Sequence, residues 1–353
     1  MAVLHNRVSR KELREKAASD KTPRRTVSFY RYTPIADPRH CRNQWYSALQ
    51  TLGVFGRIYI AHEGVNAQIS IPEHRLEELR QFLEQEPGFS GLRLNLAVDE
   101  NSRSFFVLDI KVRDKIVADG ITDPDFSMTR VGKYVDAEGF NRLASDPDTI
   151  IVDMRNYYEY EVGHFEGAIE VPSDTFREQL PMASDMLGDR KDQNIIMYCT
   201  GGIRCEKASA WMLHQGFHNV FHLEGGIINY VRQVEERGLE NKFLGKNFVF
   251  DDRLAERISP DVLAHCHQCG QPCDTHVNCA SDGCHLLFIQ CDACRAKMEG
   301  CCSADCQAYL HMDEEGKKQW RQLHPRKDGR HNKSRERIRS LLSTKDEAPG
   351  QRR

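Results

Sequence analysis

IIMYCTGGIRCEKA, residues Ile195 to Ala208, joins an apolar run to a second patterned stretch through a turn that contains a cysteine and two glycines. The apolar run predicts a buried strand, and residues 204–215 predict a helix. Cys199 would then lie at the carboxyl end of the strand, where backbone N–H groups and a helix N-terminus stabilise negative charge. The stretch therefore predicts an α/β domain with a reactive thiol at one edge of its sheet.

The same alternation of strand and helix continues on both sides of this turn. TIIVDMR and NVFHLEGG are expected to form strands, and helices are expected at residues 136–144 and 226–236. Strands that alternate with helices are typical of a parallel sheet. We expect this parallel-sheet domain at residues 133–245.

The residues upstream show a different order of elements. Residues 26–120 are expected to fold as βαββαβ, which is typical of the ferredoxin-like arrangement, an antiparallel sheet with helices on one face. Residues 1–25 are expected to form an N-terminal extension and residues 121–132 a linker. The expected fold class is thus α/β overall: an α+β ferredoxin-like domain, a parallel-sheet domain and a small cysteine-rich C-terminal segment.

Composition excludes several classes of protein. The 353-residue chain has no apolar run of about 18 residues, so no membrane span is expected. Its N-terminus lacks the apolar segment of a secretory signal. Ten of the thirteen cysteines lie between Cys266 and Cys306. Without an export signal, metal ligation or redox chemistry explains them better than disulfides, and we expect a cytoplasmic protein.

The turn after the central strand is too short for a phosphatase loop. Cysteine-dependent phosphatases place five residues between cysteine and arginine, whereas four separate Cys199 from Arg204. The loop therefore suits a single sulfur atom better than a phosphate, and the charge of Arg204 favours the thiolate. Cys205 is a candidate to resolve an oxidised or persulfidated Cys199 by forming a disulfide, with simple packing as the alternative. The intervening loop residues are Thr200, Gly201, Gly202 and Ile203.

The cysteine-rich segment, residues 246–312, carries a metal-binding pattern. Two CxxC pairs, Cys266 with Cys269 and Cys291 with Cys294, have the spacing with which two turns hold one tetrahedral zinc ion. A structural zinc would help to fold a segment that has few large apolar residues, whereas an iron–sulfur cluster is the alternative. The candidates for a second site are Cys273, Cys279, Cys284, Cys301, Cys302 and Cys306, with His276 or His285.

Two further features are candidates for contact with RNA. From Lys317 to Arg353, within the basic tail at residues 313–353, 13 Lys or Arg oppose four Asp or Glu. Such a segment binds phosphates without sequence preference, although it can equally be a solvated tail. Tyr157, Tyr158 and Tyr160 follow a predicted strand and are candidates to stack on a splayed base, with ordinary packing as the alternative.

The segment VDMRNYYEYEVGHFEGAIEVP (residues 152–172), with CTGGIR and LEGGI, resembles a rhodanese domain. This resemblance implies that Asp153 and Arg155 help to organise the sheet edge next to the active loop. Glu159 and His164 match the E-x4-H-x2-G-A pattern of such domains, either as structural hydrogen-bonding groups or as catalytic ones.

Over about residues 25–310, the motifs EGVNAQIS, KVRDKIVADG and CTGGIRCEKA and the cysteine-rich stretch resemble the bacterial tRNA uridine(34) hydroxylase family. The resemblance implies oxygen-dependent conversion of the wobble uridine to 5-hydroxyuridine. Molecular oxygen would be the co-substrate, the tRNA anticodon loop the partner and Cys199 the essential thiol. It leaves the electron donor and the oligomeric state open.

The residues alone leave the chemistry between two routes. We find neither a 2-His-1-carboxylate pattern nor a dinucleotide fingerprint, so oxidation would proceed through sulfur or through the substrate itself. Cys199 could carry a persulfide, or its thiolate could add to C6 of uracil. The competing functions are a sulfurtransferase that passes persulfide sulfur to tRNA or another acceptor, and an RNA-binding adaptor, against which the intact loop argues.

Overall fold

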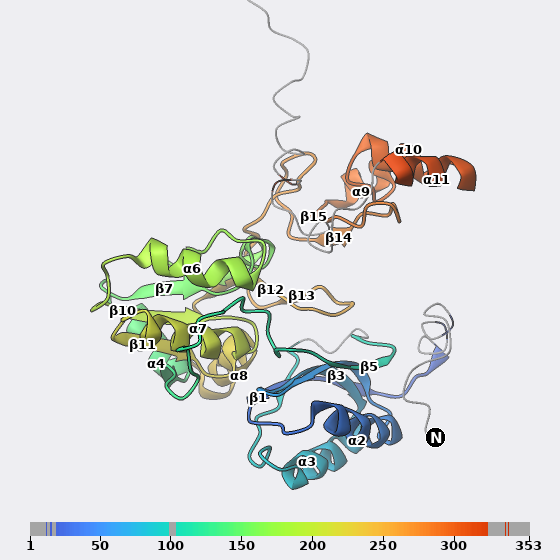
Figure 1. Ribbon diagram of the computed structural model, residues 1–353. Helices are drawn as coiled ribbons and strands as arrows, with labels where there is room; N and C mark the ends of the chain where they lie inside the picture. The colour runs from blue at the N-terminus through green and yellow to red at the C-terminus, as the bar shows by residue number, and fades with distance from the viewer. Residues whose placement is uncertain are drawn as a thin grey trace, which may run out of the picture.

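The computed structural model describes residues 19–98 and 104–323, together with Glu12, Glu15, Glu336 and Ile338 (Figure 1). Within these residues, no helix combines the length and apolar character needed to cross a membrane. Most of the predicted N-terminal extension and most of the basic tail lie outside the described residues, and the last two residues of that extension, Arg24 and Arg25, belong to the first strand. Contact between that tail and RNA therefore stays a prediction.

The first domain is a five-stranded sheet with strand order β4-β1-β3-β2-β5. β5 runs parallel to β2, and the other neighbours are antiparallel. Without β5, this order is that of the predicted ferredoxin-like arrangement, and β5 adds one edge strand to it. The elements are β1 (Arg24–Tyr32), α2 (Pro38–Thr51), β2 (Phe55–Ala61), β3 (Gly64–Pro72), η1 (Glu73–Arg75), α3 (Leu76–Gln85), β4 (Asn95–Leu96) and β5 (Leu108–Val112).

The two faces of this sheet differ in polarity. Successive side chains of β1 point to opposite faces, and Val27 and Phe29 pack with Trp45 of α2 in the core. Ser28 and Tyr30 point to the other face. Helices α2 and α3 lie on the apolar face, so the polar face is free of helices and is turned toward the second domain (Figure 1). This helix-free face supplies one wall of the candidate site.

The second domain contains a parallel sheet with strand order β6-β11-β10-β7-β9, which confirms the predicted parallel-sheet domain. Helices α6 and α7 pack with one face of the sheet, and α4 and α8 with the other. The elements are β6 (Lys133–Val135), α4 (Ala137–Ala144), β7 (Ile150–Asp153), α5 (Tyr157–Tyr160), β8 (Gly163–Phe165), β9 (Ile169–Glu170), α6 (Phe176–Leu187), β10 (Asn194–Tyr198), α7 (Ile203–His214), β11 (Asn219–Leu223) and α8 (Gly226–Arg237).

Helix α6 was not predicted from the sequence. Pro181 lies inside it, and a proline in a helix interior removes a hydrogen bond and normally breaks the helix. The helix forms because Phe176, Leu180 and Leu187 are buried against the sheet and α7. Tertiary packing thus overrides the local signal.

The cysteine-rich segment is joined to the second domain by a strand. β12 (Phe243–Phe248) pairs with β8 on one side and β13 (Ala255–Arg257) on the other. Beyond it, short elements surround two groups of cysteines, and the chain therefore has the three parts that were predicted. The remaining elements are β14 (His276–Asn278), β15 (Leu287–Ile289), α9 (Asp292–Met298), α10 (Ala304–Leu310) and α11 (Glu314–Leu323).

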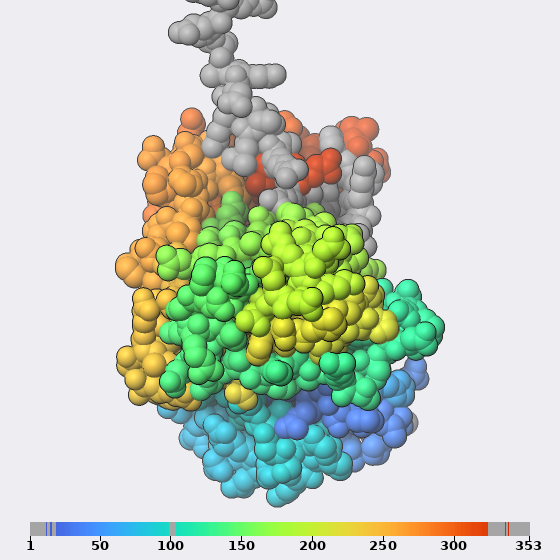
Figure 2. All heavy atoms as spheres, turned by 90° about the vertical axis from the view of Figure 1, so that its left-hand side faces the viewer, coloured from blue at the N-terminus to red at the C-terminus, as the bar shows by residue number. Residues whose placement is uncertain are grey.

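A buried lysine joins the first two domains. Lys207 on α7 is 2% exposed, and its Nζ lies 2.5 Å from Glu63 Oε2 and 3.3 Å from Asp119 Oδ2. Beside it, the hydroxyl of Tyr30 donates to Glu206 at 2.8 Å. On the face seen in Figure 2, atoms of the second domain meet those of the first without a gap. These contacts hold the helix-free face against the N-terminal end of α7.

Replacing Lys207 should weaken this junction. We expect Lys207→Met to lower the free energy of unfolding by about 3 kcal/mol, because the buried Asp119 carboxylate keeps only Lys115 as a partner and Glu63 loses its cation. Lys111→Met is the matched control, since Lys111 pairs with Asp109 at the surface and such pairs contribute about 1 kcal/mol or less. Urea unfolding followed by circular dichroism measures both variants. Equal losses would show that the buried pair does not hold the domains together.

Candidate functional site

Cys199 lies where the parallel sheet meets the first domain. It follows β10 directly, and the loop from Cys199 to Gly202 leads into α7. The backbone N–H of Gly202 donates to the Cys199 sulfur at 3.2 Å. Gly202 has a φ of +100°, and a Cβ there would lie 3.0 Å from the Tyr30 hydroxyl oxygen. The turn needs glycine at this position for its conformation and for the close approach of the first domain.

The surroundings of Cys199 favour its thiolate. The residue is fully buried, and burial raises its pKa. The hydrogen bond from the Cys205 thiol, the charge of Arg204 and the N–H groups of Cys205 and Gly202 outweigh burial and lower the pKa to about 6. Burial and the neighbouring Cys199 sulfur raise the pKa of Cys205 well above its ordinary value. At neutral pH, Cys199 is therefore a thiolate and Cys205 a thiol that donates to it.

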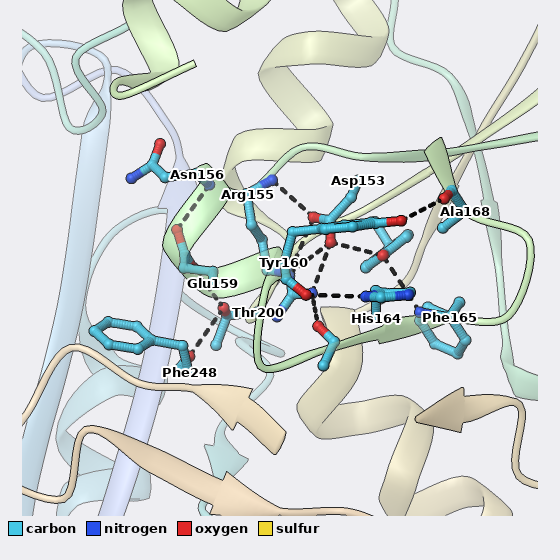
Figure 3. A network of polar contacts seen from close by, with 12 residues as sticks. Asp153, Arg155, Asn156, Glu159, Tyr160, His164, Phe165, Ala168, Thr200 and Phe248 are labelled. Carbon is cyan, nitrogen blue, oxygen red and sulfur yellow. Dashed lines mark hydrogen bonds and ion pairs between the residues drawn. The ribbon is translucent and has the colours of Figure 1, made fainter. Parts of the chain in front are cut away.

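Arg204 is held by a carboxylate rather than left free. Its two terminal nitrogens lie 2.7 and 2.8 Å from the two oxygens of Glu159, in a buried bidentate pair. Glu159 also accepts from the Asn156 N–H at 3.0 Å and from the Thr200 hydroxyl at 3.4 Å (Figure 3). Burial raises the pKa of Glu159, but the charge and hydrogen bonds of Arg204 outweigh burial. The pKa of Glu159 is therefore below its ordinary value, and the carboxyl stays ionised. The pair fixes the shape of the loop next to Cys199.

A second buried ion pair lies beneath the loop. The Arg155 guanidinium donates to Asp153 Oδ2 at 2.6 Å and to the Gly163 carbonyl at 2.5 Å. The hydroxyl of Tyr198 donates to the same carboxylate oxygen at 2.6 Å. Because Tyr198 immediately precedes Cys199, this network ties the end of β10 to β7 and β8 (Figure 3).

His164 is part of the packing rather than of the loop. Its Nδ1 lies 2.9 Å from the Tyr160 carbonyl oxygen, and its ring stacks on the Tyr160 ring with centroids 3.9 Å apart. Burial lowers its pKa. Tyr157 and Tyr158 are 6% and 2% exposed, so the hypothesis that they stack on a base is wrong. One face of Tyr160 is covered by His164.

A cavity of about 260 Å³ lies between the Cys199 loop and the helix-free face of the first domain. The loop lines one side of it and polar side chains of β1 and β3 line the other, with Phe250 and Arg253 from the segment after β12. The sequence interpretation placed no functional residue in the first domain. The alternation of polar and apolar residues in TVSFYRY and VNAQISI was the available signal, since it predicts a polar sheet face.

The described cysteines form two groups that could each hold a metal ion. Within each group, all four sulfur atoms lie within 4.8 Å of one another. The 3.6 Å contacts of Cys269 with Cys291 and of Cys284 with Cys302 match the edge of a tetrahedron around zinc, about 3.8 Å for Zn–S bonds of about 2.3 Å. The thiol chemistry and spacing therefore fit zinc. The groups are Cys266, Cys269, Cys291 and Cys294, and Cys279, Cys284, Cys302 and Cys306.

The second group contains only four of the residues that the sequence offered as candidates for a second metal site. Cys273 and Cys301 lie outside both groups, and so do His276 and His285. Four sulfur atoms complete a tetrahedral shell, so neither group has a place for a fifth ligand.

Three protein-family models match the chain. The UPF0176 acylphosphatase like domain matches residues 24–116, the rhodanese-like domain residues 136–233 and the Rhodanase C-terminal model residues 244–307. The rhodanese resemblance is thereby confirmed. Among solved structures, the rhodanese-like domain of an Anabaena sp. protein is 25% identical and covers 32% of this chain and 78% of that chain, with a TM-score of 0.26.

Curated relatives match nearly the whole chain, and those described here are named tRNA uridine(34) hydroxylase. The protein from Enterobacter sp. (strain 638) is 54% identical and covers 98% of this chain and 99% of the relative. The protein from Salmonella schwarzengrund is 55% identical over 99% and 100%. The protein from Photorhabdus laumondii is 59% identical over 89% and 90%. At this identity and coverage, the chain belongs to the tRNA uridine(34) hydroxylase family.

Proposed function

We propose that this chain hydroxylates C5 of the wobble uridine, position 34, in the anticodon loop of cytoplasmic tRNA, and that Cys199 is the reacting thiolate. One observation carries the proposal. A buried cysteine with a pKa of about 6 faces a cavity whose opposite wall is lined by amide and hydroxyl side chains. Such walls can pair with the edge of a base that has been splayed out of the anticodon loop.

The chemistry balances through a covalent adduct between the enzyme and the base. The Cys199 thiolate attacks C6 of uracil, which forms a C–S bond and moves an electron pair to C5, where O4 stabilises the charge. C5 then takes one atom of molecular oxygen. Loss of the C5 proton and cleavage of the C6–S bond restore the double bond and the thiolate. The second oxygen atom becomes water with two electrons and two protons from an external reductant.

The surrounding residues hold the thiolate ready for this addition. Arg204 and the loop N–H groups stabilise the sulfur as an anion, and the Arg204–Glu159 pair keeps the guanidinium in place. The Cys205 thiol donates a hydrogen bond to the Cys199 thiolate, and this hydrogen bond is given up when Cys199 forms the C–S bond. The buried position of Cys199 excludes water from the adduct.

We propose zinc as the ion of both cysteine groups, with a structural role. The donor sets are thiolates alone, and closed four-sulfur shells leave no open position for a substrate. Zinc bound there would contribute to the folding free energy of residues 266–306, since the segment is short of large apolar side chains.

Replacing the nucleophile tests the catalytic assignment. Cys199→Ser should lower hydroxylation by more than about 10³-fold with an unchanged fold, because a serine hydroxyl stays protonated at neutral pH. Cys205→Ser should cost less than about 10-fold, since its hydroxyl still donates to Cys199. Nucleoside mass spectrometry of tRNA from a deletion strain carrying each variant measures both.

Cys41→Ser, in α2 of the first domain, is the matched control and should behave like wild type. Wild-type levels of 5-hydroxyuridine with Cys199→Ser would disprove the assignment. Loss of a thiolated uridine instead would favour the sulfurtransferase alternative.

The pH dependence follows from the lowered pKa. The thiolate fraction of Cys199 increases as the pH rises through about 6, so alkylation by iodoacetamide should accelerate with a midpoint near that pH and then level off. Arg204→Gln should move the midpoint upward, because the positive charge that favours the thiolate is lost. Peptide mass spectrometry follows the rate at Cys199.

Cys41 is an internal control, because burial raises its pKa to about 11 and its thiol should react slowly over the same range. A midpoint for Cys199 near that of an ordinary thiol, about 8.5, would contradict the proposed thiolate.

Metal analysis tests the two cysteine groups. We expect about two zinc ions per chain and a colourless protein, with about one ion left in Cys284→Ser. Cys273→Ser, outside both groups, should keep both ions. Elemental analysis with absorption spectroscopy decides the matter, and stoichiometric iron with bands near about 400 nm would overturn the structural assignment.

A further inference from the structure

The helix-free face of the first domain carries a row of polar side chains above the Cys199 loop. Strands β1 and β3 place Ser28 directly opposite Gln68 and Tyr30 opposite Asn66. These four side chains line the same cavity as Cys199. The Oγ of Ser28 is buried and has no hydrogen-bond partner among the described residues. This wall therefore holds polar groups that the protein itself leaves unsatisfied.

Two amides on this wall are oriented by a relay of hydrogen bonds. The Nδ2 of Asn66 donates to the Ile116 carbonyl at 3.1 Å, and the Nε2 of Gln68 donates to Asn66 Oδ1 at 2.6 Å. A backbone carbonyl can only accept, so it fixes which end of the Asn66 amide is the donor. Asn66 then fixes Gln68 in turn. The Ile116 N–H is itself held by Glu63 at 2.9 Å.

The relay leaves a defined pattern on Gln68. Its Oε1 has no hydrogen-bond partner among the described residues, and Nε2 keeps one hydrogen after its bond to Asn66. Gln68 thus offers one acceptor beside one donor. Asn95, the other amide of this wall, is 6% exposed and already donates to the Gly201 and Gly225 carbonyls at 3.4 Å. Asn95 therefore positions the loop, and Gln68 is the amide available to a ligand.

We infer that Gln68 selects uracil over cytosine by pairing with its N3–O4 edge, and that Asn66 is the positioning residue that sets the orientation of Gln68. Uracil presents N3–H as a donor and O4 as an acceptor, which complements the free Oε1 and the remaining Nε2 hydrogen of Gln68. Cytosine presents the reverse pattern, an acceptor at N3 and a donor at N4. In the orientation that Asn66 imposes, cytosine would oppose acceptor to acceptor and donor to donor.

The same placement suits the proposed reaction, on which this inference rests. The N3–O4 edge and the C6 atom lie on different sides of the pyrimidine ring. A base held at Gln68 by its pairing edge would turn C6 toward the opposite wall of the cavity, where the Cys199 loop lies. One wall of the cavity, with Gln68, would then select the base, and the opposite wall, with Cys199, would react with it.

Binding of two short RNAs tests the inference without turnover. Anticodon stem-loops that differ only in U34 or C34 are titrated against full-length protein without oxygen or reductant, and fluorescence anisotropy gives the ratio of the two affinities. Wild type should prefer U34, and Gln68→Met should reduce that preference by about 10-fold or more, as expected for a bidentate pair. Gln68→Glu, almost identical in shape, should abolish the preference, because its carboxylate accepts from N3–H of uracil and from N4 of cytosine alike and donates to neither base.

The positioning role of Asn66 has a separate signature. Asn66→Ala frees the Gln68 amide to turn over, so the U34 preference should fall while affinity for U34 changes by less than about threefold. Gln81→Met on α3, an exposed glutamine on the other side of the sheet, is the matched control and should retain the wild-type ratio.

The outcomes separate this inference from the proposed function. If wild type prefers U34 and forms 5-hydroxyuridine in air with an added thiol reductant, but Gln68→Met and Gln68→Glu keep its affinity ratio, the inference is overturned and the function stands. If wild type forms no 5-hydroxyuridine from the U34 RNA in air with an added thiol reductant, the proposed function fails, and the inference fails with it.

Discussion

The buried ion pair between Arg204 and Glu159 is the constraint around which the site is built. A guanidinium and a carboxylate are costly to bury, and this pair is stable because each is satisfied by the other and by Thr200 of the loop, while Glu159 also accepts from the Asn156 N–H. Glu159 occupies both terminal nitrogens of Arg204, so the guanidinium has no free pair of donors for a larger anion. The positive charge of Arg204 still lies close enough to Cys199 to lower its pKa. The loop therefore stabilises one sulfur anion. The Asp153–Arg155 pair plays the corresponding part at the end of β7, where it ties Tyr198 and thus the start of the loop to neighbouring strands.

The first domain turns this loop into an enclosed site. A ferredoxin-like sheet with helices on one face has a second face to cover, and here the Cys199 loop and the N-terminal end of α7 from the second domain cover it. The ion pair of Lys207 with Glu63 joins the two domains directly before β3, the strand that carries Asn66 and Gln68. Three motifs that are far apart in the chain, EGVNAQIS, KVRDKIVADG and CTGGIRCEKA, thus meet in one place. Their shared position explains why a single cavity contains a thiolate on one wall and oriented amides on the other.

Much of this could be predicted from the sequence, because the signals were local. The strand, turn and helix around Cys199, the βαββαβ order and the Cys266 group all depend on short-range periodicity or spacing. Helix α6 escaped prediction because Pro181 argues against it locally, while burial against the sheet supports it. The pairing of Arg204 with Glu159 joins residues that are 45 positions apart in the chain. The position of Gln68 opposite Cys199 depends on contact between two domains, so neither feature could be predicted from local sequence. The second cysteine group was ambiguous because adjacent Cys301 and Cys302 offer the same spacing, and only the fold selects one of them.

The central claim is that the Cys199 thiolate adds to C6 of the target uridine. An anticodon stem-loop with deuterium at C5 of U34, incubated with the protein in ordinary water without oxygen, tests this step in isolation. Addition at C6 makes C5 basic, so protonation there and reversal of the adduct exchange the label with solvent. The account predicts loss of deuterium, detected by nucleoside mass spectrometry, with wild-type protein and none with Cys199→Ser. Full retention of deuterium by a protein that forms 5-hydroxyuridine in air would contradict it and would place the oxygen chemistry on sulfur instead.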